Sequence, residues 1–368
     1  MLSRIYRKRR QRVSRCGSLA IVIGFSPWKE FIKDWLPNRN VVRTRRDLSC
    51  FAFFTLIVPR LLMARQPEVY VWGFKAPTYV AFFCQRFEIP LIRVEDGFIR
   101  SVALGASKAP PLSLCMDAKT LYFDATTAST LEDILNNYDF ANDHQLMKRA
   151  DKGINAFLEL KLSKYNTGAP ADAIALYGPK QGKRVLVLGQ VEGDMSILKG
   201  CDRPITNNEL VSIAASENPD AQIIYKPHPE VIRGTRQDSS HSSPRDVEHI
   251  ADVIYEDISL ADALDTVDHV YTITSLSGFE ALLRGIRCTC LGAPFYAGWG
   301  LTDDRQPTPR RKRRLTIEQL FAGSYILYPQ YYDPVGKRTI SFESAIQLLH
   351  SLKLKSEKTA NNGSTDSF

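Results

Sequence analysis

Short apolar runs alternate with longer amphipathic stretches along the chain. The apolar runs predict strands at 19–24, 69–73, 90–95, 120–124, 184–188, 221–230, 269–274 and 286–292. The amphipathic stretches predict helices at 128–164, 207–216, 258–266 and 275–285. Strands that alternate with helices in this way are typical of parallel α/β sheets. We therefore expect an α/β fold with two Rossmann-like, doubly wound domains that face each other across a cleft.

The domain boundaries are expected where the composition changes. The loop YNTGAPADA is rich in Gly and Pro and separates the two sets of strands. We expect an N-terminal domain at 1–175 and a C-terminal domain at 176–325. A segment at 326–354 is expected to pack back on the N-terminal domain, and the polar tail at 355–368 is expected to be disordered.

The composition is that of a globular protein in a reducing compartment. The chain has 368 residues, of which 44% are hydrophobic and 24% charged, which is enough for two domain cores. The seven cysteines are scattered and show neither a CxxC pair nor a zinc-type spacing. This pattern indicates reduced thiols in a cytoplasmic protein.

Two apolar segments need a separate interpretation. The segment FAFFTLIVPRLLMA (51–64) is too short for a membrane span and contains Pro59 and Arg60, so we expect a buried helix there. The segment LAIVIG (19–24) follows a basic start, as in a signal peptide. Its apolar run is shorter than such peptides need, so we expect the first strand there.

The net charge of +8 is concentrated in two basic runs, Arg4 to Arg15 and RRKRR (310–314). Such runs are either solvated surface or a contact with anionic lipid, where each basic residue contributes about 1 kcal/mol. The sequence contains no aromatic-interleaved basic segment and no recognised nucleic-acid module, so we expect no nucleic-acid partner.

Polar residues with reactive groups follow three predicted strands of the second half. They are Gln190, Glu192 and Asp194 after the first strand, Lys226 and His228 after the second, and Ser275 and Ser277 after the third. Ligands of open parallel sheets bind outside the carboxyl ends of the strands. We therefore expect these side chains at one common edge of the sheet.

Each of these segments also has a purely structural interpretation. In GQVEGDMSI, Gly193 permits a turn, and Asp194 is either a helix N-cap or a carboxylate nucleophile or base. In YKPHPE, two prolines stiffen the chain beside His228, which either points at a ligand or lies on the surface. In SLSGFEALL, Ser277 is expected to be an N-cap that forms a capping box with Glu280, at a helix start that also attracts anions.

In the first half, the stretch RVEDGFIRSVALGA carries the candidate residues. It places Glu95 and Asp96 at a strand end, followed by Arg100, Ser101 and a loop of small residues. The dipeptide DG is also common in ordinary turns. GFSPWK (24–29) and WGFKAP (72–77) likewise follow strands, and each brings a lysine and aromatic residues to the same edge.

Five motifs follow one another along the chain: EDGFIRSVALGA, GQVEGDMSI, YKPHPE, SLSGFEALLRG and APFYAGWGLTDDR. Together they resemble the signature set of the bacterial capsule polysaccharide β-Kdo transferases, and the likeness covers most of the chain. The resemblance implies a GT-B fold and retaining transfer of Kdo from CMP-β-Kdo in capsule or surface polysaccharide synthesis. The larger members of that family carry two such modules in tandem. One module is matched here, which implies a single kind of linkage or dependence on a partner.

The resemblance also implies roles for residues of this chain. Asp194 is expected to attack the anomeric carbon and hold the sugar covalently. Glu95 or Asp96 is the candidate base for the acceptor hydroxyl, and Arg100 could pair with the Kdo carboxylate. The residues expected at the CMP moiety are Gln190, Lys226, His228, Ser275, Ser277 and Glu280, with Lys226 and His228 on its phosphate.

The N-terminal domain would then bind the acceptor and the C-terminal domain CMP-Kdo. No cofactor or metal is expected, because cationic side chains and helix amides can take up the charge of the departing nucleotide. Asp303 and Asp304 are adjacent, but we assign them to structure. Further expected partners are a lipid-linked or glycan acceptor and a capsule biosynthesis complex, with the protein cytoplasmic and peripheral on the inner membrane face.

Two alternatives remain open at this point. The first is another GT-B enzyme that transfers or epimerises a different nucleotide-linked sugar. The second is a non-catalytic component of capsule assembly or export that binds glycan without turnover.

Overall fold

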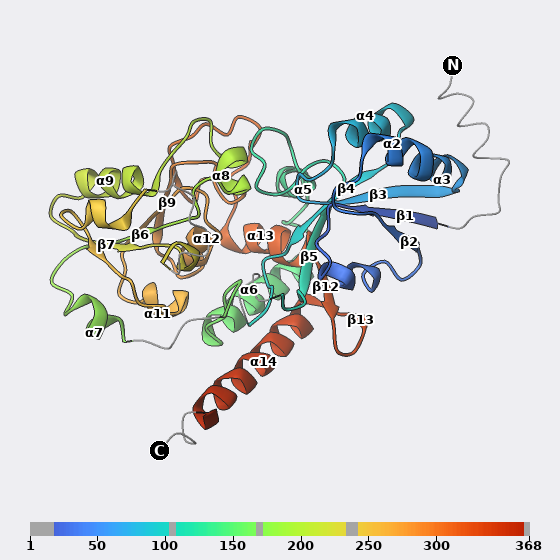
Figure 1. Cartoon of the computed structure of the whole chain (residues 1–368). Coiled ribbons are helices and arrows are strands. Elements are labelled where there is room, and N and C mark those ends of the chain that lie inside the picture. The colour runs from blue at the N-terminus through green and yellow to red at the C-terminus, as the bar shows by residue number, and fades with distance from the viewer. Residues whose placement is uncertain (1–17, 103–107, 167–171, 233–241, 364–368) are drawn as a thin grey trace. The chain divides into compact units, whose positions relative to one another are not determined.

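The computed structural model describes residues 18–102, 108–166, 172–232 and 242–363, and the contacts divide them into two units (Figure 1). The first unit comprises the described residues up to Ser101, those within 105–121, and 329–345. The second comprises the described residues of 122–328 and those from Ile346 onward, together with Val102. Each unit is built around one β-sheet.

Within the described residues, the first sheet has seven strands in the order β13-β12-β5-β4-β3-β1-β2. Their bounds are β1 (Ser18–Ile23), β2 (Asn40–Arg43), β3 (Gln66–Trp72), β4 (Leu91–Asp96), β5 (Ser113–Asp117), β12 (Gln330–Asp333) and β13 (Arg338–Thr339). The first four strands are parallel, and β5, β12 and β13 continue the sheet in antiparallel pairs. The loops after β1, β3 and β4 therefore leave from the same edge.

The second sheet, again over the described residues, has six parallel strands in the order β11-β10-β9-β6-β7-β8. Their bounds are β6 (Arg184–Leu188), β7 (Gln222–Lys226), β8 (Asp252–Val253), β9 (His269–Thr272), β10 (Arg287–Cys290) and β11 (Asp303–Asp304). Counted from β8, this is the strand order of the Rossmann fold, which reverses between β6 and β9. Ligands of such sheets bind outside the carboxyl ends beside that reversal.

Helices connect the strands and cover the sheets. In the first unit they are η1 (Lys29–Lys33), α2 (Cys50–Ala52), the π-helical η2 (Phe53–Ile57), α3 (Val58–Met63) and α4 (Thr78–Phe87). In the second unit they are α5 (Thr130–Asn137), α6 (His144–Glu159), α7 (Ala173–Tyr177), α8 (Met195–Gly200), α9 (Asn207–Glu217), α10 (Pro229–Ile232), η4 (Pro244–Val247), α11 (Leu260–Ala263), α12 (Leu276–Leu283), α13 (Ile317–Phe321) and η5 (Ala322–Leu327). The last helix is α14 (Phe342–Gly363).

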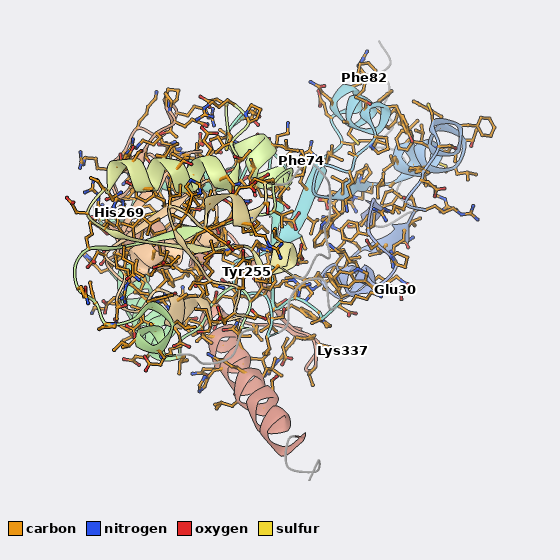
Figure 2. The ribbon with its side chains drawn as sticks, turned by 60° about the vertical axis from the view of Figure 1, so that its left-hand side comes forward. Glu30, Phe74, Phe82, Tyr255, His269 and Lys337 are labelled. Carbon is orange, nitrogen blue, oxygen red and sulfur yellow. The ribbon has the colours of Figure 1, made fainter. Side chains whose placement is uncertain are left out.

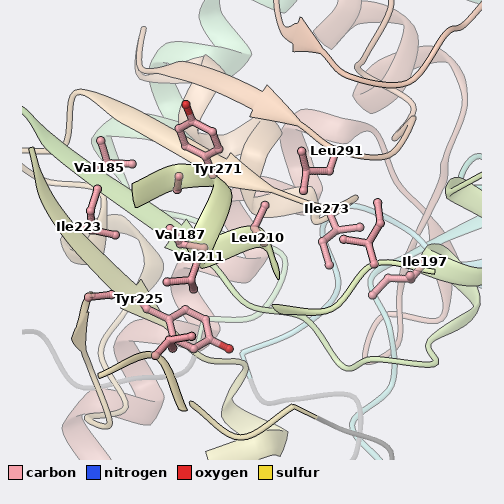
Figure 3. Close-up of a cluster of buried hydrophobic side chains, with 14 residues drawn as sticks. Val185, Val187, Ile197, Leu210, Val211, Ile223, Tyr225, Tyr271, Ile273 and Leu291 are labelled. Atoms are coloured by element: carbon pink, nitrogen blue, oxygen red, sulfur yellow. The ribbon is translucent and has the colours of Figure 1, made fainter. Parts of the chain in front are cut away.

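A buried apolar cluster holds the second sheet to its helices (Figure 3). Val185 and Val187 point to one face of β6, where Ile197 of α8 and Leu210 of α9 join the same cluster. Leu186 points to the opposite face and is also fully buried. The central strand is thus covered on both faces, as expected for a doubly wound parallel sheet.

In the first unit, α2, η2, α3 and α4 cover one face of the sheet. Ile21 and Val69 of the sheet pack with Phe53, Ile57 and Phe83 from this helical layer. The helix predicted at 51–64 is therefore confirmed, with a π-helical turn inside it. The prediction that it is buried is wrong for its outer side, where several large apolar side chains are exposed.

Seven of the eight predicted strands are confirmed, and the one at 120–124 is wrong. The strand predicted at 221–230 ends at Lys226, because Pro229 already begins α10. The strand in this region is β5, which pairs with β4 in an antiparallel ladder. Tyr122 and Phe123 instead lie in a turn, where the Tyr122 ring contacts that of Phe295 at 6.0 Å between centroids. The aromatic run is thus used for side-chain packing rather than for a strand.

The two units into which the contacts divide the chain have other boundaries than the predicted domains. Residues 122–166 belong to the second unit, where α5 and α6 pack on α13 and η5. Residues 329–345 return to the first unit, where β12 pairs with β5. The prediction of disorder from 355 is wrong as far as Gly363, because α14 continues to that residue.

Three further expectations concern the chain as a whole. None of the described helices combines the length and apolarity required to span a bilayer. The six cysteines among the described residues carry free thiols. The basic run from Arg4 to Arg15 lies outside the described residues.

Candidate active site

Three loops leave the carboxyl edge of the second sheet next to one another. The register pairs Leu188 of β6 with Lys226 of β7 on one side and with Thr272 of β9 on the other. The segments GQVEGD, PHPE and SLSGFE that follow these strands therefore begin side by side. This edge adjoins the reversal of strand order, the position where ligands bind in such sheets.

Gln190 joins two of these loops. Its Oε1 accepts a hydrogen bond from the backbone N–H of Thr274 at 2.7 Å, and its Nε2 donates to Thr274 Oγ1 at 3.1 Å. Its backbone exchanges two hydrogen bonds with the side chain of Asn207. Both polar atoms of the Gln190 side chain thus have protein partners, so Gln190 positions the two loops. A ligand contact of Gln190 stays a prediction.

Glu192 is also fixed by the protein. Its Oε1 accepts a hydrogen bond from the backbone N–H of Asn207 at 2.6 Å, and its Oε2 accepts one from the backbone N–H of Ser242 at 2.9 Å. These bonds satisfy an amide in the first turn of α9 and tie the GQVEGD loop to the segment before η4. Glu192 therefore orders the loop that carries Asp194.

Asp194 is the N-cap of α8. Its Oδ1 accepts hydrogen bonds from the backbone N–H and from the hydroxyl of Ser196, both at 2.9 Å. Gly193 before it has a φ of +78°, in the left-handed region that glycine adopts without strain. The N-cap interpretation is confirmed, and the half-buried carboxylate is held at a fixed orientation by its cap. A helix start and a nucleophile are compatible roles for this residue.

Lys226 ends β7 as a buried cation, with 7% of its surface exposed. Burial lowers the pKa of its ammonium group below the usual value, while the charge of Asp257 partly offsets this effect. Within the part of the chain that the structure describes, this ammonium group has no hydrogen-bond or ion-pair partner. A buried charge that is only partly compensated is costly, so Lys226 is suited to bind an anion from outside the protein.

His228 follows at the start of the next loop. Its Nδ1 accepts a hydrogen bond from the backbone N–H of Glu230 at 3.2 Å, which places the ring proton of the neutral form on Nε2. Its backbone carbonyl accepts from Val231 N–H in the turn that opens α10. The KPHP segment thus presents a fixed imidazole tautomer next to Lys226. A ligand contact of His228 stays a prediction.

Ser275, and not Ser277, is the N-cap of α12. Its Oγ accepts a hydrogen bond from Ser277 N–H at 3.2 Å. The predicted capping box is wrong, because Glu280 turns into the unit and its Oε1 accepts hydrogen bonds from Ser163 Oγ at 2.8 Å and Lys164 N–H at 3.2 Å. Only 1% of Glu280 is exposed, so the structure does not present it to a phosphate or ribose.

Burial of Glu280 has a measurable consequence for stability. It raises the pKa of Glu280 from 4.5 to about 7. Between these values the folded protein holds a proton that the unfolded chain has released, so this contribution to stability falls as pH rises. Near pH 4.5, we expect Glu280→Gln and the native protein to have the same free energy of unfolding. Above pH 7, the free energy of unfolding of the variant should be higher by on the order of 3 kcal/mol. Unfolding by denaturant at the two pH values measures this difference, and an equal gap at both would contradict it.

The APFYAGWG segment supports the start of α12. The hydroxyl of Tyr296 donates a hydrogen bond to the carbonyl of Ser275. A side chain at Gly278 would collide with that hydroxyl, so the close approach requires glycine. Trp299 is fully buried, and its Nε1 donates to Phe295 O at 2.8 Å. The segment therefore holds the candidate site in place without supplying reactive groups.

The first unit has a separate group of charged residues at the edge of its sheet. Arg100 donates from Nε to Asp96 Oδ2 at 2.9 Å and from a terminal nitrogen to Ser101 Oγ at 2.7 Å. The Arg100 side chain is fully buried and forms an ion pair with Asp96. Its pairing with a sugar carboxylate stays a prediction. Glu95 is half-buried and adjoins Asp96 on β4.

Lys29 is a functional candidate that the sequence analysis noted only within GFSPWK. Its Nζ lies 2.7 Å from the centroid of the Trp72 ring and 5.2 Å from that of Trp28. Burial lowers its pKa to about 8, although Asp96 and Glu95 favour the charged form. A lysine in such surroundings can bind an anion or exchange a proton near neutral pH. Its spacing after the strand was visible in the sequence, but its burial was not.

The run RRKRR binds to α5 within the second unit. Arg310 Nε donates to Glu132 at 2.7 Å and Arg311 Nε donates to the same carboxylate at 3.4 Å. Arg313 donates to the carbonyl of Tyr138 at 2.8 Å. The prediction that this run is solvated surface or a lipid contact is therefore wrong for Arg311, whose side chain is 4% exposed. Arg310 and Arg313 stay partly exposed but are held by acceptors on α5 and at Tyr138, which follows it.

Asp303 and Asp304 also have structural partners. Asp304 Oδ2 accepts a hydrogen bond from Gly298 N–H at 2.9 Å, and Asp303 Oδ2 accepts one from Arg305 at 2.9 Å. Their assignment to structure agrees with the prediction. Among the described residues, no group of three or more His, Cys, Asp or Glu side chains is arranged to hold a metal ion.

Comparison with known proteins identifies relatives of this chain. Residues 68–331 match the family described as capsule polysaccharide biosynthesis protein. The lipopolysaccharide-processing protein LpsZ of Rhizobium meliloti is 43% identical over 321 residues, which are 85% of this chain and 70% of LpsZ. The capsule polysaccharide modification protein LipA of Neisseria meningitidis serogroup B is 42% identical over 342 residues, 93% of this chain. The chain spans 46% of the length of LipA.

Two solved structures share the fold. The β-Kdo 2,4 transferase of KpsC from Thermosulfurimonas dismutans has a TM-score of 0.75 and 34% identity, covering 89% of this chain and 97% of that chain. The β-Kdo 2,7 transferase of the same protein has a TM-score of 0.71 and 33% identity, covering 91% of this chain and 100% of that chain. The prediction of an α/β, GT-B-like fold with two Rossmann-like sheets is confirmed.

Proposed function

Because the chain belongs to the capsule polysaccharide biosynthesis protein family, we propose that it is a glycosyltransferase that moves Kdo from CMP-β-Kdo to a surface-polysaccharide acceptor. The likeness to both KpsC transferases supports the reaction class. It covers 89% and 91% of the chain, with sequence identities of 34% and 33%. The names of LpsZ and LipA support lipopolysaccharide or capsule as the setting.

The observation that carries the proposal is the buried ammonium group of Lys226 beside the loops of β6 and β9. Asp257 offsets the burial of this group only in part, and no hydrogen bond or ion pair occupies it among the described residues, so a nucleotide phosphate would supply a direct anionic partner. The Nε2–H of His228 and the start of α12, capped by Ser275, would contribute further donors for the same anion. These groups would also stabilise CMP as it departs.

Asp194 is the proposed nucleophile on the same edge. One of its carboxylate oxygens would attack the anomeric carbon of Kdo while the bond from that carbon to the CMP phosphate breaks. The electron pair of the broken bond leaves with CMP. An acceptor hydroxyl would then attack the same carbon from the opposite face and release Asp194, so that two inversions retain the configuration.

The second step needs a base for the proton of the acceptor hydroxyl. Of the two predicted candidates, Glu95 fits better than Asp96. Asp96 is 9% exposed and ion-paired with Arg100, whereas Glu95 is half-buried. Glu95 would take the proton, and Lys29 would contact an anionic group of the acceptor.

Mass spectrometry of the intact protein tests the covalent step. After incubation with CMP-Kdo and no acceptor, we expect a species heavier by one Kdo residue, because the second step then lacks its hydroxyl nucleophile. Addition of an acceptor that supports turnover should discharge it. Turnover with no adduct at any time point of a rapid-quench series would contradict the covalent intermediate. A protein that binds neither CMP nor CMP-Kdo would contradict the transferase proposal itself.

The two KpsC transferases bear on the product. Each is named for a single linkage, and this chain matches each of them over nearly the whole of that chain, 97% and 100%. We propose that the site described here likewise forms one type of Kdo linkage. Product analysis by linkage-sensitive NMR would reveal a second type if the same site made both.

A further inference from the structure

The helical layer of the first unit has a large apolar outer surface. The inner side of this layer is buried against the sheet through Phe53, Ile57 and Phe83. Its outer side exposes Phe51, Phe54, Leu56, Leu62, Met63 and Phe82, with Phe51 79% and Phe82 69% exposed. We call these six side chains the outer helical face. Half of the twelve exposed large hydrophobic residues in the described part of the chain belong to it.

The two helical segments that carry these residues pack against each other. The ring of Phe54 lies 6.1 Å from that of Phe83 on α4, and the Phe53 ring lies 5.5 Å from it. The hydroxyl of Tyr79 donates to the carbonyl of Leu48, which ties the loop before α2 to α4. In Figure 1, α2, α3 and α4 lie together on one side of β1 and β3, and Figure 2 shows Phe82 on the outside of that layer.

Five exposed arginines occur in the same segments as this apolar surface. The segments 45–65 and 78–88 contain Arg45, Arg46, Arg60, Arg65 and Arg86 against two acidic residues, Asp47 and Glu88. All five arginines are exposed. None of the ion pairs found among the described residues includes Arg45, Arg46, Arg60 or Arg86.

The helical spacing places charge and apolar side chains on the same side. Leu56, Arg60 and Met63 are separated by four and three positions, so they line one side of the helical segment. Phe82 and Arg86 are four positions apart on α4 and are neighbours in the same way. Apolar side chains between cations are the pattern of a surface that lies in the interface of a lipid bilayer.

A basic stretch precedes the first strand in the sequence. Ser18, the first residue of β1, pairs with Gln66, which follows Arg65 and α3, and its hydroxyl donates to Gln66 Oε1 at 3.1 Å. The preceding residues 1–15 contain seven Lys or Arg and no acidic residue. The basic sequence therefore joins the folded chain next to the end of the outer helical face.

We propose that the outer helical face docks this unit onto an anionic membrane surface. The apolar side chains would enter the boundary between headgroups and acyl chains, and the arginines would contact the headgroup phosphates. A second copy of the chain fits less well, because symmetric pairing of this face would bring its arginines toward one another. The inference does not depend on the reaction assigned to the carboxyl edges of the two sheets.

Vesicle co-sedimentation of the full chain tests the docking surface. We expect binding to vesicles of phosphatidylcholine with phosphatidylserine, and at least about tenfold weaker binding to vesicles of phosphatidylcholine alone. Phe51→Ser combined with Phe82→Ser should lower binding to the anionic vesicles by about tenfold or more. Arg45→Gln combined with Arg46→Gln should also lower it and reduce its dependence on salt.

A matched control distinguishes binding through the outer helical face from non-specific binding through any exposed apolar side chain. Val335 is 82% exposed in the turn between β12 and β13, so Val335→Ser removes an apolar group outside the face and should leave binding unchanged. Thermal unfolding should be similar for all variants, since the changed side chains are exposed. Unchanged vesicle binding by the Phe51 and Phe82 double variant would overturn the proposal. A second outcome would also overturn it: a native protein that is a dimer, a double variant that is a monomer, and no vesicle binding by either protein. That result would identify the face as a self-association surface.

Discussion

Asp194→Asn is expected to abolish Kdo transfer and leave the fold and CMP binding intact. Asparagine keeps the shape of the side chain and is as good an N-cap as aspartate, so α8 should start at the same residue. The amide oxygen is a far weaker nucleophile than a carboxylate, so the covalent step is lost. Without the nucleophile we expect kcat to fall by on the order of 10⁴-fold or more. Steady-state transfer from CMP-Kdo and calorimetric titration with CMP measure the two effects.

Asp172→Asn is the matched control for this variant. Asp172 is the N-cap of α7, and its Oδ1 accepts from Ile174 N–H at 2.9 Å, so the same chemical change is made at a second helix start. The control should retain transfer. If Asp194→Asn turns over at a native rate, the nucleophile lies elsewhere and Asp194 only caps α8. If it loses CMP binding as well, the change has disturbed the site and the result does not identify the nucleophile, in which case the adduct measurement decides.

Lys226→Met is expected to weaken CMP binding by about 3 kcal/mol, or roughly a hundredfold in Kd. The substitution keeps an unbranched side chain of similar length and removes the charge that we place on the donor phosphate. Stability should not fall at neutral pH. The pKa of Lys226 is lowered in the folded state, so the folded protein carries the cost of a buried ammonium group at every pH below that value. Methionine removes this cost.

The pH dependence of binding gives an independent check on Lys226. The ammonium form holds the phosphate, so CMP affinity in the native protein should decline as pH rises through the lowered pKa of Lys226. The methionine variant should lack that decline. Lys152→Met, at an exposed position of α6, provides the control and should bind CMP like the native protein. A methionine variant with native affinity would remove Lys226 from the phosphate site and, with it, the observation on which the proposed function is based.

Much of the candidate site could be predicted because its residues come directly after strands that the sequence indicates. The apolar runs that form β6, β7 and β9 are short and bounded by polar residues, and in parallel sheets their carboxyl ends share one edge. The N-cap character of Asp194 and the turn at Gly193 depend on local backbone geometry. Local geometry is what a short stretch of sequence specifies.

The roles that changed were those of side chains with distant partners. Arg100 was expected to contact a ligand, and the fold pairs it with Asp96, a partner that the sequence did not indicate. Glu280 was expected in a capping box and instead accepts from Ser163, 117 positions away in the chain. The basic run at Arg310 binds Glu132, 178 positions away. In each case the residue type indicated a charged group or a hydrogen-bond acceptor. It did not indicate which distant residue the fold would place next to that group.

The sequence by itself determined the α/β architecture, the four inner strands of the second sheet and the edge at which its reactive groups gather, because apolar periodicity and strand ends are local properties. The tertiary structure alone decided which partners the candidate groups of both units have. It paired Arg100 and Glu280 within the protein, left Lys226 buried without a partner among the described residues, and exposed the outer side of the helix that begins at Cys50. Burial and pairing depend on what packs against a residue, and that is settled only when distant segments of the chain come together.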